Sequence, residues 1–174
     1  MVFTIMMRKD EKSKQFQALI EQHKGILFKV ARTYCQDKED RQDLIQEISI
    51  QIWQSLDRYN SKYKISTWLY RISLNVAISF YRKNAKRQNR SIPLNEHISE
   101  IKEIDQTDKE EQLGLLEHFI SELNDIDKAL MLLYLEDKSH KEIADILGIS
   151  QSNVGTKIGR IKVKLKTRFS QLNS

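Results

Sequence analysis

Aromatic and basic side chains are interleaved in one stretch of the first half of the chain. From Arg58 to Asn95 there is no acidic residue, whereas nine lysines and arginines are present. Aromatic rings stack on unpaired bases and cations follow the phosphate backbone, so this composition predicts a contact with a single nucleic-acid strand. The rings of this stretch are Tyr59, Tyr63, Trp68, Tyr70, Phe80 and Tyr81. Trp68 and Phe80 also lie on a helical apolar stripe, which favours a core position for both.

Some members of this stretch fall outside the apolar stripe, and we expect them to be exposed. Asn75 follows Arg71 by four residues, so the two share one helix face, and this pair would suit the edge of a base. The simpler interpretation is a solvated basic face with no ligand. The residues predicted to be exposed are Tyr59, Tyr63, Arg71, Asn75, Arg82 and Lys83.

Residues 139–168 have the spacing of a helix-turn-helix. When His140 is counted as the first helical position, Ala144 is the fifth, Gly148 the ninth and Val154 the fifteenth. The small residue lets the second helix cross closely, the glycine turns the backbone sharply, and the apolar residue holds the second helix in the core. Ser150 is placed to cap the second helix. The simpler alternative is a helical hairpin with a charged exterior.

The first turns of that second helix are predicted to enter the major groove, where amide and guanidinium groups hydrogen-bond to base edges. Gly155 and Gly159 are unusual there, since each costs up to ~1 kcal/mol in a helix interior, and close approach of the backbone to DNA would explain one of them. The predicted outward residues are Gln151, Ser152, Asn153, Gly155, Thr156, Lys157 and Arg160. Later basic residues suit phosphate contacts, which add affinity without sequence preference. These are Lys162, Lys164, Lys166 and Arg168.

A helix predicted over residues 40–53 has the opposite character. Its apolar stripe is Leu44, Ile48 and Ile52, and Trp53 is either an apolar anchor or part of the core. Acidic groups repel DNA, so the face opposite this stripe is expected to contact a protein. That polar face consists of Asp40, Asp43, Gln46, Glu47 and Gln51.

The elements that position these residues are predicted to be helices throughout. Only five glycines and one proline occur in 174 residues, and apolar residues recur at helical spacing with no sustained strand alternation. We therefore expect an all-α fold of two small helical domains, at 13–88 and 112–172. The polar segment at 89–111, which contains Pro93, is predicted to be a flexible linker between them.

Several functional classes are disfavoured by composition. Cys35 is the only cysteine, which excludes an intramolecular disulfide framework and suits a reducing compartment. No apolar run approaches the ~20 residues of a membrane helix. The short apolar start, 1–7, does not resemble a signal peptide, so we expect a cytoplasmic protein without membrane contact of its own.

Catalysis is the first rival class, and little supports it. Carboxylate pairs can be imagined from Glu21, Asp40 and Glu47, but nothing separates them from surface acids. The histidines lack metal-ligand spacing and no phosphate-binding glycine loop occurs, so neither a metal nor a cofactor is expected. These histidines are His23, His97, His118 and His140. The other rivals are a two-domain transcriptional regulator, which would share the helix-turn-helix, and a basic surface that contacts membranes.

Three motifs together resemble the extracytoplasmic-function (ECF) group of the sigma-70 family of bacterial transcription initiation factors. They are DLIQEISIQIW at 43–53, STWLYRISLNVAISFYRK at 66–83, and HKEIADILGIS followed by Val154 at 140–154. The resemblance extends over about 16–172. It implies sigma-2 and sigma-4 domains, no catalytic activity, binding to core RNA polymerase and recognition of promoter DNA. It also implies contacts with the β′ clamp and β flap of the polymerase, an acidic linker inside the polymerase clefts, and control by an anti-sigma factor.

The resemblance assigns roles to individual residues. Asp43, Gln46 and Glu47 fall in the helix that docks on the β′ clamp. Ser66, Thr67 and Trp68 match the loop that captures a flipped base of the minus-ten element, and Arg71, Asn75 and Arg82 lie on the helix that reads or supports the melted strand. Thr156, Lys157 and Arg160 match the helix that reads the minus-thirty-five element. The chain departs from the family pattern at Gly155, where Arg or Lys is common, and at Gly159, where a larger side chain is common.

Overall fold

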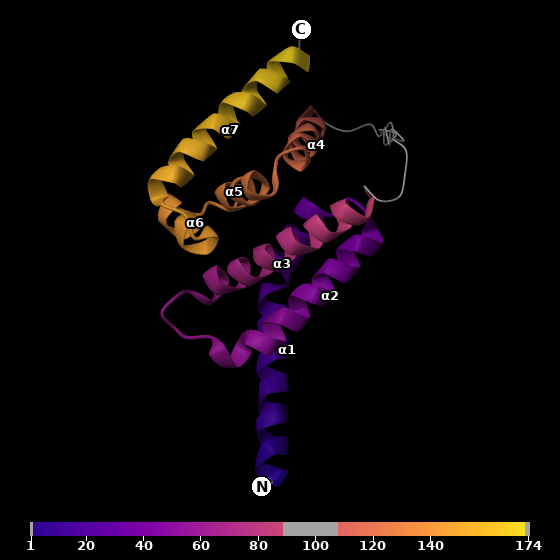
Figure 1. The fold of residues 1–174 in the computed structure, drawn as a ribbon, viewed down its shortest axis with the longest axis vertical. Coiled ribbons are helices and arrows are strands. Elements are labelled where there is room, and N and C mark those ends of the chain that lie inside the picture. Colours follow the sequence, from indigo (N-terminus) through magenta and orange to yellow (C-terminus); the bar gives the residue numbers. More distant parts are fainter. Residues whose placement is uncertain (1, 89–107, 173–174) are drawn as a thin grey trace. The chain divides into compact units, whose positions relative to one another are not determined.

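The structure of the chain, a computed structural model, describes residues 2–88 and 108–172, and among these residues it is helical with no β-strand. Its elements follow one another along the chain as Figure 1 shows. In order they are α1 (Val2–Tyr34), α2 (Lys38–Ser55), the 3-10 turn η1 (Leu56–Arg58), α3 (Ile65–Gln88), α4 (Asp108–Ser121), α5 (Asp125–Leu135), α6 (His140–Leu147) and α7 (Gln151–Leu172). The predicted all-α class is confirmed.

Two compact units are present. One takes in α1, α2 and the start of α3, and the other takes in α4, α5, most of α6, and α7. Most of the predicted linker, 89–107, lies outside the described residues. α4 begins at Asp108, inside the range predicted for the linker, and α1 begins at Val2, before the predicted start of the first domain.

The first unit is held together by one apolar face of each helix. Leu44, Ile48 and Ile52 follow one another at intervals of four, so they share a face of α2, and all three are fully buried. On α1 the buried residues include Leu27 and Val30. α2 begins directly after Asp37, whose Oδ2 accepts the backbone N–H groups of Glu39 and Asp40 at 2.8 and 3.1 Å. This cap provides two of the four N–H groups at the helix start with an acceptor.

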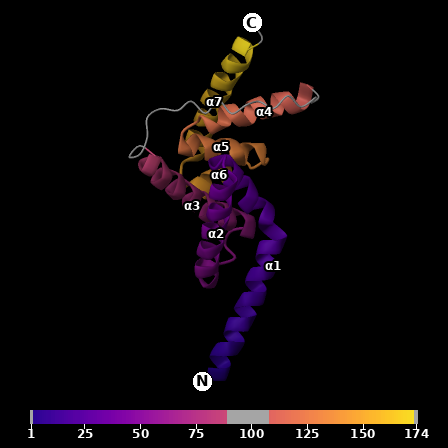
Figure 2. The same cartoon turned by 90° about the vertical axis from the view of Figure 1, so that its right-hand side faces the viewer.

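The long first helix is fixed to the end of α2 by an aromatic contact. The rings of Phe16 and Trp53 meet edge to face with centroids 5.3 Å apart, and Lys12 Nζ lies 4.8 Å from the Trp53 ring centroid. Lys12 also pairs with Asp57. Trp53 is therefore part of the α1–α2 packing, whereas the first turns of α1 project beyond α2 and α3 (Figure 2).

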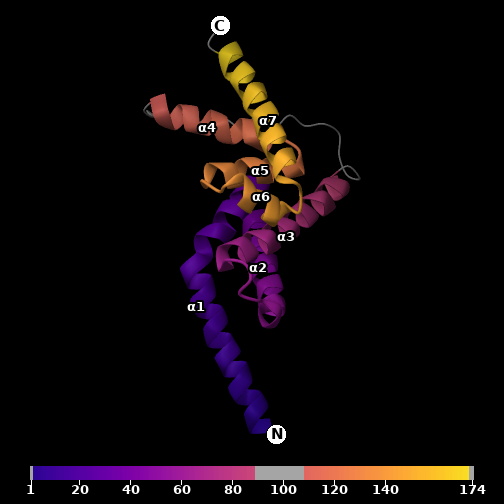
Figure 3. The same cartoon turned by 90° about the vertical axis from the view of Figure 1, so that its left-hand side faces the viewer.

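In the second unit, α5 supplies the centre, and α4 and α7 pack against it. Leu130 and Leu133 of α5 and Val154 of α7 are fully buried. Further along α7 the buried residues are Ile158, Ile161 and Leu165. The short α6 leads through a tight turn into the long α7 (Figure 3). Within the described parts of the chain, no helix is long and apolar enough to cross a membrane.

Candidate nucleic-acid interface

The helix-turn-helix begins with a capping box. Ser139 Oγ accepts the backbone N–H of Glu142 at 3.2 Å, and a carboxylate oxygen of Glu142 accepts the backbone N–H of Ser139 at 3.0 Å. α6 therefore starts at His140, the first position assumed in the sequence prediction. The prediction did not use the Ser-x-x-Glu pattern, although that pattern alone signals a helix start.

The turn has the predicted geometry. Gly148 has φ 68° and ψ 34°, a left-handed conformation that costs glycine little, and its N–H donates to the Ala144 carbonyl at 2.9 Å. Ser150 Oγ accepts the N–H of Asn153 at 3.1 Å and thereby caps α7. Val154 is fully buried. The turn glycine, the cap and the core position are all confirmed.

The recognition helix, meaning the first four turns of α7, presents most of its predicted reading residues to solvent. Thr156 Oγ1 donates to the Ser152 carbonyl at 3.0 Å, which fixes that hydroxyl on the helix. The exposed residues are Gln151, Ser152, Asn153, Thr156, Arg160 and Lys164. Lys157 differs from them, because its side chain is about one-third exposed and Lys157 Nζ lies 3.3 Å from Asp127 Oδ1.

The aromatic stretch forms a small network around the loop at 59–64. The Tyr59 and Trp68 ring centroids are 5.1 Å apart, and Tyr59 Oη donates to the Tyr63 carbonyl at 2.9 Å. The Arg71 guanidinium lies 4.9 Å from the Tyr63 ring centroid. Tyr59, Tyr63 and Arg71 were predicted to be exposed, but all three are half-buried because they pack in this network. Tyr70 is buried in the core.

The expected loop position of Ser66, Thr67 and Trp68 is wrong. All three lie in the first turn of α3, which begins at Ile65, and the Trp68 N–H already donates to the Lys64 carbonyl at 3.2 Å. The helix starts this early because Leu69 continues the apolar stripe and is fully buried. Thr67 is itself buried, and Trp68 is half-buried against Tyr59. Farther along α3, three predicted residues are exposed: Asn75, Arg82 and Lys83.

The polar face of α2 is exposed at its centre, and it includes an apolar residue that the sequence analysis overlooked. Asp43, Gln46 and Glu47 are exposed, while Asp40 and Gln51 are half-buried. Ile50 is 49% exposed. It follows Gln46 by four residues and Glu47 by three, so it lies on their face, off the buried stripe. The position of Ile50 in the sequence, which falls outside the helical spacing of the buried stripe, was the signal that could have predicted its exposure. We call Asp43, Gln46, Glu47 and Ile50 the α2 face.

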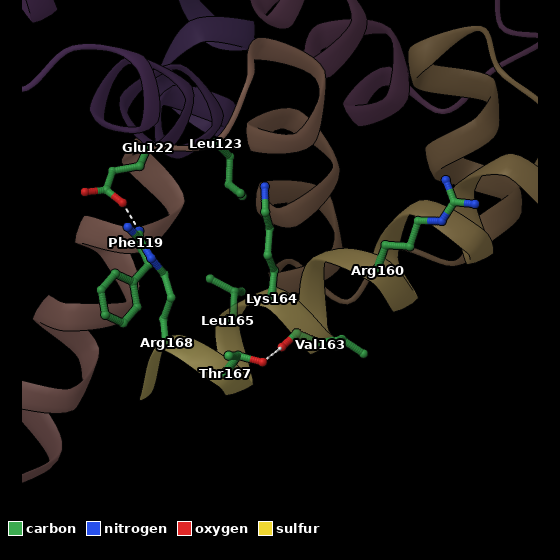
Figure 4. Close-up of a pocket in the computed structure, with 9 residues that line it drawn as sticks. All are labelled: Phe119, Glu122, Leu123, Arg160, Val163, Lys164, Leu165, Thr167 and Arg168. Carbon is green, nitrogen blue, oxygen red and sulfur yellow. Dashed lines mark hydrogen bonds and ion pairs between the residues drawn. The ribbon is translucent and has the colours of Figure 1, made fainter. Parts of the chain in front are cut away.

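A groove of about 450 Å³ lies between the end of α4 and α7, and sequence reasoning did not find it (Figure 4). Leu123 and Lys164 point toward one another from its two sides. Arg168, predicted to contact phosphate, pairs with Glu122 and lies 5.0 Å from the Phe119 ring centroid. The groove thus combines an apolar floor with basic groups on its rim. Its lining residues are Phe119, Glu122, Leu123, Arg160, Val163, Lys164, Leu165, Thr167 and Arg168.

The titratable groups offer little for reaction chemistry. Among the described residues, no group of three or more His, Cys, Asp or Glu side chains could hold a metal ion. Asp37 has a lowered pKa because the backbone N–H groups of Asp40 and Glu39 stabilise its carboxylate. Asp37 serves as a helix cap, so this shift belongs to helix structure and not to a reactive site.

Comparison with known proteins adds two family matches. Residues 19–87 match the family model described as Sigma-70 region 2, and residues 113–165 match the model described as Sigma-70, region 4. The first match takes in α2 and the aromatic network, and the second takes in α6, the first four turns of α7 and all of the groove lining except Thr167 and Arg168.

Individual relatives agree with these matches. The chain is 30% identical to the RNA polymerase sigma factor SigZ of Bacillus subtilis (strain 168) over 124 residues, which cover 71% of this chain and 69% of SigZ. It is 25% identical to the ECF RNA polymerase sigma factor SigM of the same organism, over 88% of this chain and 94% of SigM. Its fold is similar to the sigma factor RpoE of Bartonella quintana, solved in complex with the anti-sigma factor NepR. The TM-score is 0.69 at 17% identity, and the alignment covers 90% of this chain and 98% of RpoE.

Proposed function

Since the chain belongs to the ECF group of the sigma-70 family, we propose that it binds core RNA polymerase and directs the enzyme to promoters. The observation that carries this proposal is the α2 face. Three polar or acidic side chains lie on the same helix face as an exposed isoleucine there, in a chain that also contains a basic helix-turn-helix. Carboxylates are repelled by DNA, while an apolar residue beside charged groups suits a protein partner.

The α2 face is proposed to dock on the β′ clamp of the polymerase. Ile50 would be the desolvated centre of that contact and Asp43 and Glu47 its charged margin, with Asp40 and Gln51 at the half-buried edge. Charged margins govern the rate of association and the choice of partner, and apolar centres govern lifetime. Loss of the carboxylates is therefore expected to weaken capture of the polymerase.

The aromatic network and α3 are proposed to hold the melted minus-ten element. Tyr63 carries a basic group over its ring, and Asn75 is exposed one helical turn after Arg71. A base stacked near Tyr59, Tyr63 and Trp68 would gain ~1–3 kcal/mol. In this proposal Ser66 and Thr67 support the loop from the first turn of α3, while Arg82 and Lys83 follow the strand backbone.

The recognition helix is proposed to read the minus-thirty-five element. Its exposed amides, hydroxyls and Arg160 are the groups that hydrogen-bond to base edges. The groove between α4 and α7 is proposed to receive the β flap, since its apolar floor suits a helix and its rim is basic.

An anti-sigma factor is the proposed regulator, because RpoE is described as bound to NepR. Polymerase acts in the bacterial cytoplasm, and the proposal assigns the chain to that compartment.

Binding to core polymerase tests the proposal. The variant Asp43→Arg/Glu47→Arg reverses two exposed charges on α2 and is expected to lose retention of core polymerase in a pull-down. The matched control, Asp10→Arg/Glu11→Arg, makes the same charge change on exposed residues of α1 and is expected to bind like the unmodified chain. Equal binding by all three proteins would reject the α2 face. Tight binding to duplex as a symmetric dimer, with no affinity for core polymerase, would instead favour a conventional transcriptional regulator.

A further inference from the structure

One ion pair ties the recognition helix to the start of α5. Lys157 Nζ lies 3.3 Å from Asp127 Oδ1, and the other carboxylate oxygen, Oδ2, accepts a hydrogen bond from Asn124 Nδ2 at 2.8 Å. Asn124 caps α5, and its Oδ1 accepts the Asp127 N–H at 3.0 Å. Both oxygens of Asp127 are therefore engaged, and its side chain is 18% exposed. The hydrogen bonds with Asn124 therefore hold the Asp127 carboxylate in place independently of Lys157.

The position of Lys157 on α7 agrees with this role. An α-helix turns by about 100° per residue, so Lys157 lies about 60° from the fully buried Val154 and about 100° from the exposed Thr156. It borders the buried face, whereas Ser152 and Thr156 share the face directed away from the core. An ammonium at that border reaches an acceptor on α5 without crossing the outward face.

We propose that Asp127 is a positioning residue that keeps Lys157 off the DNA, so that Lys157 braces the recognition helix against α5 and does not contact the promoter. This inference rests on the proposed function and changes the role that the family resemblance gives to Lys157. The upstream element is then read by Gln151, Ser152, Asn153, Thr156 and Arg160. The pair has no net charge, so Lys157 releases no counterion when DNA binds.

The ion pair between Asp127 and Lys157 has an electrostatic consequence for DNA binding. Removal of Lys157 alone leaves the Asp127 carboxylate without its cation, next to the helix that must approach phosphates, and this weakens binding indirectly. Neutralising both groups removes the repulsion and restores binding. Neutralising Asp127 alone releases Lys157, which then reaches phosphate and adds sequence-independent affinity.

The test measures binding of the holoenzyme to promoter duplex as a function of salt, for Lys157→Met, Asp127→Asn and the double variant. Asparagine keeps an acceptor for Asn124 and so preserves the cap. Each phosphate neutralised by a protein cation contributes about 0.9 to the slope of log affinity against log salt.

We expect Lys157→Met to bind severalfold more weakly with the slope of the unmodified chain, and the double variant to recover the lost affinity. Asp127→Asn should steepen the slope by about 0.9 and relax the preference for the upstream element. Lys166→Ala, which removes an exposed cation of α7 that does not line the groove and was predicted to contact phosphate, is the reference for the slope change of a phosphate contact.

Two outcomes would show that Asp127 does not keep Lys157 from contacting the DNA. One is a slope that falls by about 0.9 in Lys157→Met, since that marks a direct phosphate contact. The other is a double variant that binds no better than Lys157→Met. Failure of the proposed function looks different, because the unmodified chain would then confer no promoter binding on core polymerase. In that event the pair is still tested by thermal unfolding of the full chain, where the brace requires the two substitutions to be non-additive and additivity contradicts it.

Discussion

The imidazole of His140, at the start of α6, lies against Gly155 of the recognition helix. A Cβ added to Gly155 would be 3.5 Å from both Cε1 and Nδ1 of that ring, an ordinary van der Waals distance. Alanine therefore fits beside His140, whereas a long side chain there has to pass the ring or displace it. The packing within the protein therefore disfavours the long Arg or Lys side chain that is common in the family at this position, although it leaves room for alanine.

Enlarging Gly155 should move His140. Gly155→Ala is expected to bind promoter DNA like the unmodified chain and to raise the free energy of unfolding by up to ~1 kcal/mol, because alanine favours the helix. Gly155→Arg is expected to displace the imidazole, and NMR of the His140 ring protons reports this directly. Unchanged His140 resonances in Gly155→Arg would contradict the packing described here.

Gly159 requires a different explanation, because among the described residues nothing lies within 4 Å of a Cβ placed there apart from its two chain neighbours and the backbone of its own part of the helix. Gly159→Ala should stabilise the fold by up to ~1 kcal/mol and, if the backbone approaches DNA at this point, weaken upstream-element binding. Gly25→Ala is the matched control, since Gly25 lies in α1 with equally open space. We expect similar stabilisation from both and weaker promoter binding only from Gly159→Ala. Equal promoter binding by the two variants would mean that DNA does not approach Gly159.

The capping box predicts the cost of losing Ser139. Ser139→Ala removes the hydroxyl that accepts the Glu142 N–H, and loss of such a cap costs about 1 kcal/mol of unfolding free energy. Ser170→Ala is a suitable comparison, because the Ser170 hydroxyl donates to the Lys166 carbonyl inside α7, far from a helix start. Its effect should stay within about 0.5 kcal/mol. Urea unfolding of the full chain measures both, and equal effects would argue against a working cap.

The cap at Asp37 makes the free energy of unfolding depend on pH. The backbone N–H groups of Asp40 and Glu39 lower the pKa of Asp37 in the folded state, so the folded chain binds the proton more weakly than the unfolded chain. The resulting stability is present above the ordinary aspartate pKa of ~3.9 and is lost as the pH falls through the lower folded value. Asp37→Asn retains a capping oxygen but does not titrate at this position. The stability difference between the two proteins should shrink below about pH 4; a difference that does not change with pH would contradict the shift.

Much of the fold and part of the candidate site followed from local patterns. The spacing of Ala144, Gly148 and Val154 located the turn and the core position of the helix-turn-helix, because a sharp turn needs a residue that tolerates positive φ. The stripe of Leu44, Ile48 and Ile52 located the buried face of α2. Such signals lie within one or two helical turns, and the sequence displays them directly.

Features that depend on contacts distant in sequence were not predictable in the same way. The Asp127–Lys157 pair joins residues 30 positions apart, and nothing in the chain's pattern shows which acid a given lysine meets. The groove between α4 and α7 likewise depends on where Phe119 and Val163 come to lie. Thr67 was misplaced for another reason, since the family's loop was transferred to a segment whose own apolar spacing begins a helix at Ile65.

Transcription itself tests the central claim most directly. Core RNA polymerase would be supplied with this chain and with genomic fragments of the bacterium that encodes it, and run-off products would be mapped. We predict discrete transcripts that require the chain, begin downstream of a shared pair of sequence elements, and disappear with Asp43→Arg/Glu47→Arg but not with Asp10→Arg/Glu11→Arg. Run-off products identical with and without the chain would contradict the assignment of promoter-directed initiation.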